Sequence, residues 1–254
     1  MSKKRLIFST FIWLSLITCS SFAQKLKIKF GTSVYPPFVT LDKNQEPSGF
    51  DIELAKLICK NLSAECTFKN ETFQQLTPSL TANKYDVWIG AITINKNYQR
   101  QELLFTKPYF FSTTKLIATK KNLFGGAPNE IKGKKIGILA ETCYPELIRK
   151  TYGSSVTIKI YDSYEKLYRA LQNGDCDAVM DDELVIRNWR SRQANRSTYR
   201  LIGLPAKYKN LVWHKFGIAV AKQHPELVKI LNHAISKIKR TSNYKKLINN
   251  YLNQ

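Results

Sequence analysis

Strand-like and helix-like segments alternate along the chain with little interruption, and this alternation limits the fold more than any other feature. Residues 26–32 read as a strand, residues 49–62 as a helix with its apolar residues near one face, and residues 66–70 as the next strand. The succession continues to a short helix at 243–252. Strands separated by helices pack as layers, so the sequence predicts an α/β fold and argues against all-helical and all-β folds.

The predicted elements form two series that an extended segment connects. The first series contains a buried strand at residues 85–94, and the strand-like residues 108–120 lead into the second series. A later strand at 215–222 precedes a long helix at 224–240, with Pro225 in its first turn. Two α/β units joined by strands leave a cleft between them, and strand ends and helix N-termini face a ligand there.

The N-terminus reads as a secretion signal. Three basic residues precede the apolar residues 6–18, and the small residues Ser21 and Ala23 stand where a signal peptidase cleaves. The apolar stretch is shorter than the roughly 20 residues that span a bilayer. Cys19 raises the alternative of a lipid anchor, but the Thr before it fits that cleavage poorly. We therefore expect a signal peptide over residues 1–23.

The chain is strongly basic. It carries 40 Lys and Arg against 19 Asp and Glu, and the expected mature chain keeps 37 against 19, a formal charge of +18. Such a surplus of positive charge can bind nucleic acid or an anionic membrane surface. Here the basic residues are spread along helices and strand ends, and an exported protein meets little nucleic acid. A solvated basic surface is therefore the favoured interpretation, without a nucleic-acid partner.

Four cysteines remain in the expected mature chain. Cys59 and Cys66 are seven residues apart across a helix end and the next strand, a separation that a disulfide bond can close in an oxidising compartment. No CxxC pair or nearby His accompanies them, which argues against zinc. Cys143 and Cys176 have no evident partners, and we expect buried, unreactive thiols.

Motifs of catalysis are missing from the sequence. Cys143 precedes a predicted helix, where a thiolate is stabilised, and His214 or His233 might act as its base, but no spacing connects them. No HExxH, GxSxG or phosphate-cradling Gly loop occurs. A packed or cleft-lining cysteine is the favoured interpretation, and we expect neither a cofactor nor a metal.

Three successive acids, Asp181, Asp182 and Glu183, follow an apolar run and form an unusual cluster in so basic a chain. They lack the alternating ligands and central Gly of a calcium loop, and no partner for general acid–base catalysis is recognisable. One carboxylate at a strand end can anchor an ammonium group while the others cap the next helix. The alternative in which all three only cap that helix stays open.

Other residues complement this cluster. Arg100 follows a buried strand, and a guanidinium can hold a carboxylate through two parallel hydrogen bonds. Tyr35 and Phe73 can form two faces of an apolar or cation-binding slot. On composition alone, a solvated surface residue is as good a reading of Arg100, and core packing is the better reading of the aromatics.

Read together, several stretches resemble a known family. They are VYPPF, SGFDIELAKLICK, LTPSL, YDVWIGAITI, LLFTKPYF, IKGKKIGIL, YDSYEKLYRALQNGDCDAV and NYKKLINNYL, which follow one another over nearly all of the expected mature chain. The chain thereby resembles the periplasmic substrate-binding proteins of ABC transporters for polar amino acids. It is most similar to the members that bind arginine, to those that bind lysine, arginine and ornithine, and to those that bind histidine.

The resemblance implies a two-lobe α/β periplasmic-binding-protein fold of type II, with two hinge strands and a ligand cleft between the lobes. Lobe 1 is then expected at residues 24–111 plus 215–254, and lobe 2 at residues 112–214. It also implies a disulfide bond between Cys59 and Cys66.

The resemblance further implies roles for residues of the cleft. Asp182 matches the acid that binds the ligand's α-ammonium group, and Arg100 falls near the arginine that binds the α-carboxylate. Tyr35 and Phe73 match aromatics that enclose the ligand side chain, which suits a guanidinium. The expected ligand-binding residues are Tyr35, Phe73, Gly90, Ala91, Thr93, Arg100, Glu141, Thr142, Cys143 and Asp182.

Three departures from the family pattern concern the ligand. The usual arginine position, five residues after Thr93, holds Tyr98, so Arg100 fits only with an insertion in the loop. Cys143 replaces a hydroxyl residue and is a weaker donor. The loop before Tyr35 lacks an acid that often meets a cationic side chain, and we hypothesise that Glu141 takes that role.

The sequence therefore predicts a monomeric periplasmic receptor, not an enzyme, that captures a polar and cationic free amino acid. Arginine is the first choice, with lysine, ornithine and histidine as further candidates, and an inner-membrane ABC permease is the expected partner. One alternative is an exported enzyme similar to cyclohexadienyl dehydratases, which act on prephenate or arogenate. Another is adhesion to an anionic polymer through the basic surface.

Overall fold

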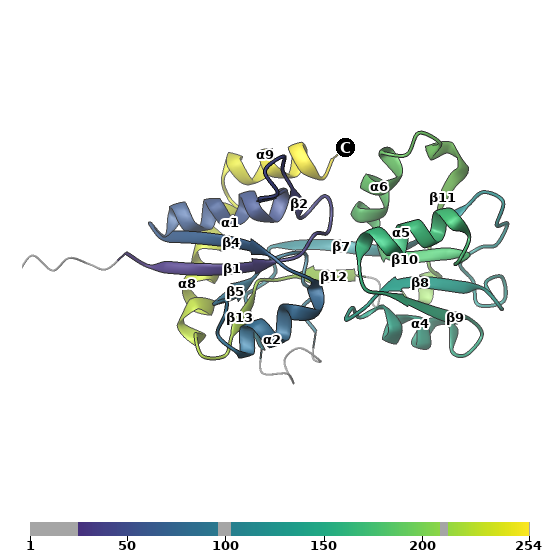
Figure 1. The fold of residues 1–254 in the computed structure, drawn as a ribbon, viewed down its shortest axis with the longest axis horizontal. Coiled ribbons are helices and arrows are strands. Elements are labelled where there is room, and N and C mark those ends of the chain that lie inside the picture. Colours follow the sequence, from purple (N-terminus) through teal and green to yellow (C-terminus); the bar gives the residue numbers. More distant parts are fainter. Residues whose placement is uncertain (1–24, 96–102, 209–212, 254) are drawn as a thin grey trace, which may run out of the picture.

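The computed structural model describes residues 25–95, 103–208 and 213–253, and these residues form two α/β lobes, each built around its own sheet (Figure 1). The predicted α/β class and two-lobe organisation are confirmed. The expected signal peptide, residues 1–23, lies outside the described residues. In the described part of the chain, no helix has the length and apolar character needed to cross a membrane.

The sheet of lobe 1 has five strands in the order β4, β1, β5, β13, β6. Their bounds are Lys27–Thr32 (β1), Glu65–Asn70 (β4), Val87–Trp88 (β5), Leu103–Phe105 (β6) and Ala219–Ala221 (β13). β1 pairs in parallel with β4 and β5, whereas β13 pairs antiparallel with β5 and β6. Since β13 comes from far along the chain, two separate segments build this lobe.

Helices and a small hairpin complete lobe 1. Their bounds are Thr40–Leu41 (β2), Pro47–Ser48 (β3), Phe50–Asn61 (α1), Phe73–Gln75 (η1), Leu76–Thr81 (α2), Pro225–Ile238 (α8) and Ser242–Tyr251 (α9). α8 begins at Pro225 as predicted, and Leu227, Leu231 and Ile235 lie buried along its predicted apolar face. The 3-10 turn η1 leads directly into α2.

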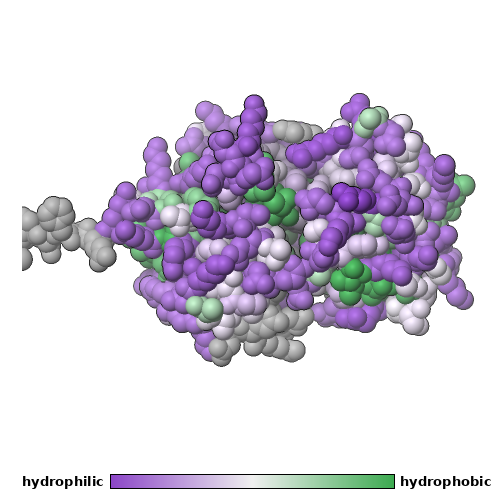
Figure 2. Space-filling view, viewed as in Figure 1, coloured by the Kyte–Doolittle hydropathy of each residue, from purple (hydrophilic) through white to green (hydrophobic). Residues whose placement is uncertain are grey.

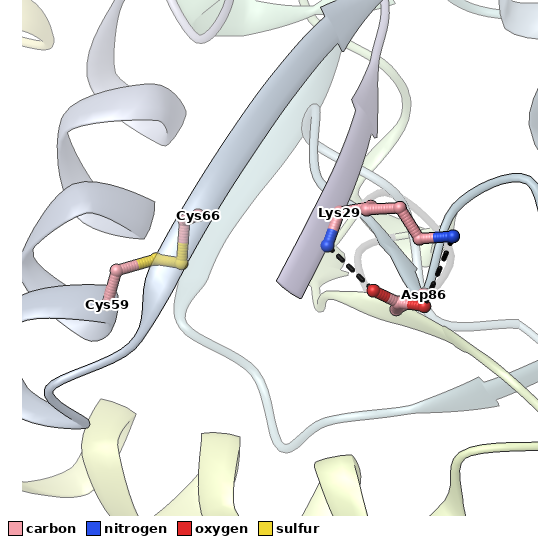
Figure 3. The surroundings of a disulfide bond; sticks show 4 residues. All are labelled: Lys29, Cys59, Cys66 and Asp86. Atoms are coloured by element: carbon pink, nitrogen blue, oxygen red, sulfur yellow. Dashed lines mark hydrogen bonds and ion pairs between the residues drawn. A yellow bond between two sulfur atoms is a disulfide. The ribbon is translucent and has the colours of Figure 1, made fainter. Parts of the chain in front are cut away.

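The disulfide bond between Cys59 and Cys66 is present, as expected. It joins the last turn of α1 to the second residue of β4 (Figure 3). Close by, Lys29 of β1 is held to Asp86, whose carboxylate accepts the Lys29 backbone N–H at 2.7 Å. These cross-links stabilise the end of the lobe 1 sheet that lies away from the cleft.

Lobe 2 contains a sheet in the order β11, β7, β10, β8, β9, with β12 also paired to β7. Its strands are Phe110–Thr119 (β7), Lys135–Leu139 (β8), Thr157–Tyr161 (β9), Ala178–Asp182 (β10), Tyr199–Ile202 (β11) and Trp213–Phe216 (β12). Its helices are Tyr144–Tyr152 (α4), Tyr164–Asn173 (α5) and Glu183–Ser191 (α6), with 3-10 turns at Arg196–Thr198 (η2) and Ala206–Tyr208 (η3). Ile136, Ile138, Ile148 and Met180 form part of its core.

Two antiparallel strands connect the lobes. β7 and β12 pair over Phe110–Thr113 and Trp213–Phe216, and they run side by side between the two sheets (Figure 1). The predicted lobe boundaries, at 111/112 and 214/215, fall within this paired ribbon and stay a prediction. A paired ribbon can bend about its length while it keeps its hydrogen bonds, which is suited to a hinge.

Figure 2 shows one face of the molecule covered mostly by hydrophilic side chains on both lobes. This agrees with the solvated surface that the charge distribution favoured. The basic surplus is partly compensated by exposed ion pairs, such as Lys56 with Glu53 and Lys150 with Glu146, both at 2.7 Å. Exposed pairs of this kind contribute little to stability.

Candidate functional site

A pocket lies between the lobes and gathers most of the predicted ligand-binding residues. Seven of them line it: Tyr35, Phe73, Gly90, Ala91, Thr93, Thr142 and Cys143. The first five come from lobe 1 and the last two from lobe 2. These residues are distant in sequence, so their convergence comes from the arrangement of the two sheets.

Further residues of the lining escaped the sequence reasoning. They are Ser33, Val34, Asn95, Leu139, Tyr144 and Phe216. Five of them stand within two residues of a predicted site residue, so each loop enters the pocket over a longer stretch than its motif. Phe216 is different, because it belongs to β12 and is buried, and its neighbours in the sequence gave no signal.

The lobe 1 wall depends on a backbone turn directly after β5. The strand predicted for residues 85–94 pairs only over Val87–Trp88, because the chain then turns at Ala91 with φ +51°. The left-handed region is costly for a residue with a side chain. Asp51 of α1 holds this turn, since its Oδ2 accepts the Ala91 N–H at 2.6 Å and the Tyr109 hydroxyl at 2.7 Å.

Asp51 is completely buried, and burial raises its pKa to about 7 despite the hydrogen bonds from Tyr109 and Ala91. It is the Asp of the GFDIELA stretch, so one part of the family signature acts as a support for the pocket wall. The sequence reasoning placed this residue only near the start of the helix.

The lobe 2 wall consists of the turn between β8 and α4. Thr142 donates its hydroxyl hydrogen to the Leu139 carbonyl at 2.7 Å, and α4 begins at Tyr144 directly after Cys143. Glu141 has φ +60° and is exposed, and it is not among the described residues that line the pocket. The predicted role of Glu141 toward a cationic side chain therefore stays a hypothesis.

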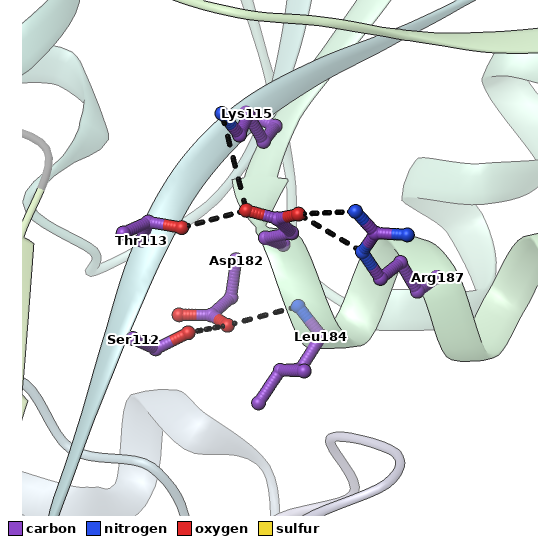
Figure 4. A network of polar contacts seen from close by, with 7 residues as sticks. Ser112, Thr113, Lys115, Asp182, Leu184 and Arg187 are labelled. Carbon is purple, nitrogen blue, oxygen red and sulfur yellow. Dashed lines mark hydrogen bonds and ion pairs between the residues drawn. The ribbon is translucent and has the colours of Figure 1, made fainter. Parts of the chain in front are cut away.

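Asp182 ends β10 and is completely buried, and it is not among the described residues that line the pocket. Its Oδ1 accepts the Ser112 hydroxyl and, at 3.3 Å, the Leu184 N–H (Figure 4). Its Oδ2 is buried and has no hydrogen-bond partner among the described residues. Burial raises its pKa to about 8, so the ionised form is disfavoured until a positive charge lies beside it.

Asp181 precedes Asp182 and has a different environment. Three tyrosine hydroxyls, from Tyr35, Tyr144 and Tyr168, donate to its carboxylate. Burial is the main cause that raises its pKa, to about 6, and these hydrogen bonds oppose the rise. Asp182, rather than Asp181, occupies the N-cap of α6, and Asp181 contributes to the helix start only by accepting the Asp182 N–H at 2.8 Å.

Glu183 lies in the first turn of α6, as expected, and is partly exposed. It accepts hydrogen bonds from Arg187 at 2.6 Å and from the Thr113 hydroxyl at 2.8 Å, and Lys115 lies 3.9 Å away. Three consecutive acids thus occupy three environments, of which only that of Asp182 leaves a buried oxygen without a donor.

His214 lies at the seam between the walls, which the sequence did not indicate. Its Nε2 is 2.9 Å from the Thr114 hydroxyl and 3.9 Å from Cys143 Sγ, and its Nδ1 is 3.4 Å from the Thr93 hydroxyl. Burial lowers the pKa of His214 to about 4 and raises that of the Cys143 thiol to about 12. Such a pair is neutral, which supports the interpretation of Cys143 as a cleft-lining residue rather than a nucleophile.

The predicted carboxylate clamp and the question of a metal site remain to be placed. Arg100, the expected carboxylate clamp, and Tyr98 lie outside the described residues. Over the described ranges, no group of three or more His, Cys, Asp or Glu side chains is arranged to hold a metal ion.

Comparisons with known proteins agree with this architecture. The ABC transporter arginine-binding protein 1 of Escherichia coli (strain K12) is 34% identical over 229 residues, which cover 90% of this chain and 91% of the relative. The histidine-binding periplasmic protein of Salmonella typhimurium (strain LT2) is 29% identical over 99% of this chain and 97% of its own length.

A solved structure described as an ancestral arginine-binding protein bound to glutamine superimposes with a TM-score of 0.79 at 28% identity, over 90% of this chain and 98% of that one. The model of one family matches residues 28–254, almost the entire described chain. The chain therefore belongs to the bacterial extracellular solute-binding proteins, family 3.

Proposed function

We propose that this protein is the periplasmic receptor of an ABC importer and that it captures a cationic amino acid, arginine in the first place. The observation that carries the proposal is the buried Oδ2 of Asp182, which has no hydrogen-bond partner among the described residues. Asp182 directly follows Asp181, whose carboxylate accepts hydrogen bonds from the pocket-lining Tyr35 and Tyr144. An unpaired buried carboxylate oxygen is unfavourable, and an ammonium group supplies the missing donor together with the opposite charge.

Polar groups for the ligand's carboxylate surround the same pocket. The Thr93 hydroxyl lies on the lobe 1 side, and the N-terminal end of α4 lies on the lobe 2 side. Arg100 remains the proposed clamp on the basis of the sequence resemblance. A carboxylate held in this way contacts both lobes, so the ligand itself favours the closed arrangement.

A second pocket that adjoins the first supports the proposal of a cationic ligand side chain. This second pocket shares Ser33, Val34, Phe73 and Leu139 with the first, and it is also lined by Glu71, Asp162 and Glu165. The ring of Phe73 and that of Tyr35 offer faces for a guanidinium. A long side chain that leaves the inner pocket would pass these rings toward carboxylates.

The mechanism follows from the hinge. β7 and β12 allow the lobes to rotate about a paired ribbon while each sheet stays intact. Closure excludes water and strengthens the charge-assisted hydrogen bonds to the ligand. We propose that the closed receptor acts as a monomer in the periplasm and delivers its ligand to an inner-membrane permease.

Calorimetric titration of ligand-stripped protein tests the proposal. The ligands are the twenty amino acids, ornithine and citrulline. Arginine is expected to bind more tightly than citrulline, which has the same length without the positive charge. Failure of every compound to bind would reject the receptor function, and equal binding of arginine and citrulline would reject the cationic specificity.

The dehydratase-like alternative is supported by no contact described above, and the family of the chain consists of solute-binding proteins. Incubation with prephenate, with detection of phenylpyruvate, tests it directly. Adhesion to an anionic polymer likewise rests only on net charge, and salt-sensitive binding to heparin would be needed to support it.

A further inference from the structure

Asp181 is the most thoroughly satisfied acid of the cleft region, although the proposed ligand contacts do not use it. The side chain is completely buried. Its Oδ1 accepts the hydroxyls of Tyr35 and, at 3.3 Å, of Tyr144, together with the Asp182 N–H at 2.8 Å. Its Oδ2 accepts the Tyr168 hydroxyl at 3.0 Å. A buried carboxylate needs such donors, because burial removes its hydration.

The three tyrosines come from different parts of the molecule. Tyr35 belongs to the loop after β1 in lobe 1, whereas Tyr144 begins α4 and Tyr168 lies in α5, both in lobe 2. Tyr35 and Tyr144 line the ligand pocket, and Tyr168 does not. One carboxylate of lobe 2 therefore holds two walls of the pocket, and one of these walls belongs to the opposite lobe.

The Tyr35 side of this contact is rigid. The Tyr35 N–H donates to the Val39 carbonyl at 2.9 Å, and the N–H groups of Phe38 and Val39 donate back to the Tyr35 carbonyl. The Tyr35 ring also stacks near that of Phe38, with centroids 6.2 Å apart. Because its backbone is fixed in lobe 1, Tyr35 can follow Asp181 only if the lobes stay together.

We propose that Asp181 is a positioning residue for ligand capture, which joins the lobes through the Tyr35 hydroxyl and fixes the two tyrosine walls of the pocket without touching the ligand. When lobe 1 rotates away, the buried carboxylate loses one donor, so opening is penalised by a charge-assisted hydrogen bond. We call this hydrogen bond between Tyr35 and Asp181 the latch. A second contact also crosses the cleft, in which Gln74 Nε2 donates to the Asp162 carbonyl at 3.0 Å.

The chain offers a matched pair of variants. Tyr35→Phe and Tyr168→Phe each remove one hydroxyl from the same carboxylate and keep the ring. Only the Tyr35 hydroxyl crosses the cleft, so a purely structural role of Asp181 predicts similar effects for both, whereas the latch predicts an effect of Tyr35→Phe on opening.

The experiment measures the distance between one label on each lobe of the full chain. Labels are attached through azide-bearing residues at the exposed positions Asn61 and Arg169, which leaves the native cysteines untouched. The ratio of closed to open molecules is read from the distance distribution with and without arginine, and the dissociation rate of arginine is measured in parallel. Thermal unfolding of each variant controls for loss of fold.

Tyr35→Phe is expected to lower the closed-to-open ratio, or to speed arginine dissociation, about tenfold, the factor that one hydrogen bond to a charged group supports. Tyr168→Phe is expected to change both by less than about twofold. Equal effects of the two variants, or no effect of Tyr35→Phe in either measurement, would overturn the proposal.

This inference rests on the proposed function only in taking the cleft as the ligand site, and the ligand-free distances separate the two. If arginine does not bind but Tyr35→Phe still opens the cleft, the proposed ligand is wrong and the latch stands. If arginine binds and the distances are unchanged in Tyr35→Phe with unaltered dissociation, the receptor function stands and the latch is wrong.

Discussion

The two walls of the cleft are built by different means. The lobe 1 wall is a strained backbone turn at Ala91, which one buried carboxylate, Asp51, holds from behind. Lobe 2 carries two buried carboxylates, Asp181 and Asp182, at the end of β10, and Asp181 accepts hydrogen bonds from Tyr35 and Tyr144 of the pocket lining. The first wall therefore offers shape and backbone groups, and the second offers charge.

This difference explains how two sheets of the same class share one task. Asp51 Oδ2 is occupied by the Ala91 N–H and the Tyr109 hydroxyl, which fix the turn of the lobe 1 wall. Asp51 Oδ1 and Asp182 Oδ2 are both buried without a hydrogen-bond partner among the described residues, so the two acids differ in what their other oxygen holds: a pocket turn for Asp51, and Ser112 with the start of α6 for Asp182. We therefore expect substitutions in the lobe 1 wall to lower mainly the stability of the protein, and substitutions in lobe 2 to lower mainly its affinity for the ligand.

The largest expected effect is on the lobe 2 wall. Asp182→Asn keeps the shape and the helix cap but removes the charge that meets the ammonium group, so arginine affinity should fall at least about 100-fold. Calorimetric titration measures this, with Glu183→Gln as the control, for which the loss should be much smaller because Glu183 is not among the described residues that line the pocket and pairs with Arg187. Equal losses in the two variants would mean that Asp182 is not the ammonium anchor.

The next effect is on the lobe 1 wall. Asp51→Leu leaves the Tyr109 hydroxyl hydrogen buried without an acceptor, and the Ala91 N–H keeps only the Tyr109 hydroxyl oxygen at 3.2 Å. The free energy of unfolding should therefore fall by about 1–3 kcal/mol in urea titrations. Asp51→Asn keeps an acceptor oxygen and is expected to cost far less. A loss of arginine affinity in Asp51→Asn without any loss of stability would contradict the division between the walls.

The contribution of His214, which lies between the two walls, to the stability of the protein should depend on pH. His214 has a pKa of about 4 in the folded protein, against about 6.5 when unfolded, so the unfolded state binds the proton first as the pH falls. The stability that the neutral imidazole contributes is present above pH 6.5 and is lost as the pH falls toward 4, by up to about 3 kcal/mol.

Unfolding of wild type and His214→Gln at a series of pH values checks this expectation. Asp51, Asp181 and Asp182 have raised pKa values, so their titration changes the stability in the direction opposite to that of His214. This contribution is present in both proteins, and it cancels when their free energies of unfolding are subtracted. A difference that does not change between pH 7 and pH 4 would show that His214 titrates normally in the folded protein.

The smallest effect is expected at Glu141, on the rim of the lobe 2 wall. The side chain is exposed, so water and salt weaken its attraction for a guanidinium, and Glu141→Gln should reduce arginine affinity only about two- to threefold. Affinity for glutamine should stay the same. If both affinities are unchanged, the hypothesis that Glu141 meets the cationic side chain is wrong.

Sequence reasoning was most successful where a local pattern carries the information. The periodicity of residues 225–238 identified α8, and the match of motifs brought Tyr35, Phe73 and Thr93 to one pocket before any geometry was known. The strand predicted for residues 85–94 was too long, since β5 covers only Val87–Trp88. The turn at Ala91 that ends it depends on Asp51, a partner 40 residues away. β11 was also missed, since its pairing with β7 is a tertiary contact.

The polar partners of the site were the least predictable. His214 lies 71 residues from Cys143, and Tyr35 lies 146 residues from Asp181, so no local spacing can join either pair. The sequence also could not divide the three acids correctly. Which of them caps α6 depends on the register of β10 against β7, where Asp182 stands opposite Thr114.

The place of β13 has a consequence for the order in which the protein is assembled. All strands of the lobe 2 sheet lie within residues 110–216, whereas the lobe 1 sheet needs Ala219–Ala221 between β5 and β6. A chain that emerges from a translocation channel N-terminus first can therefore complete lobe 2 while the earlier lobe still lacks an interior strand. Until residues 219–221 have emerged, the edges of β5 and β6 that pair with β13 stay unpaired, and a chaperone that binds extended apolar segments would find its target there.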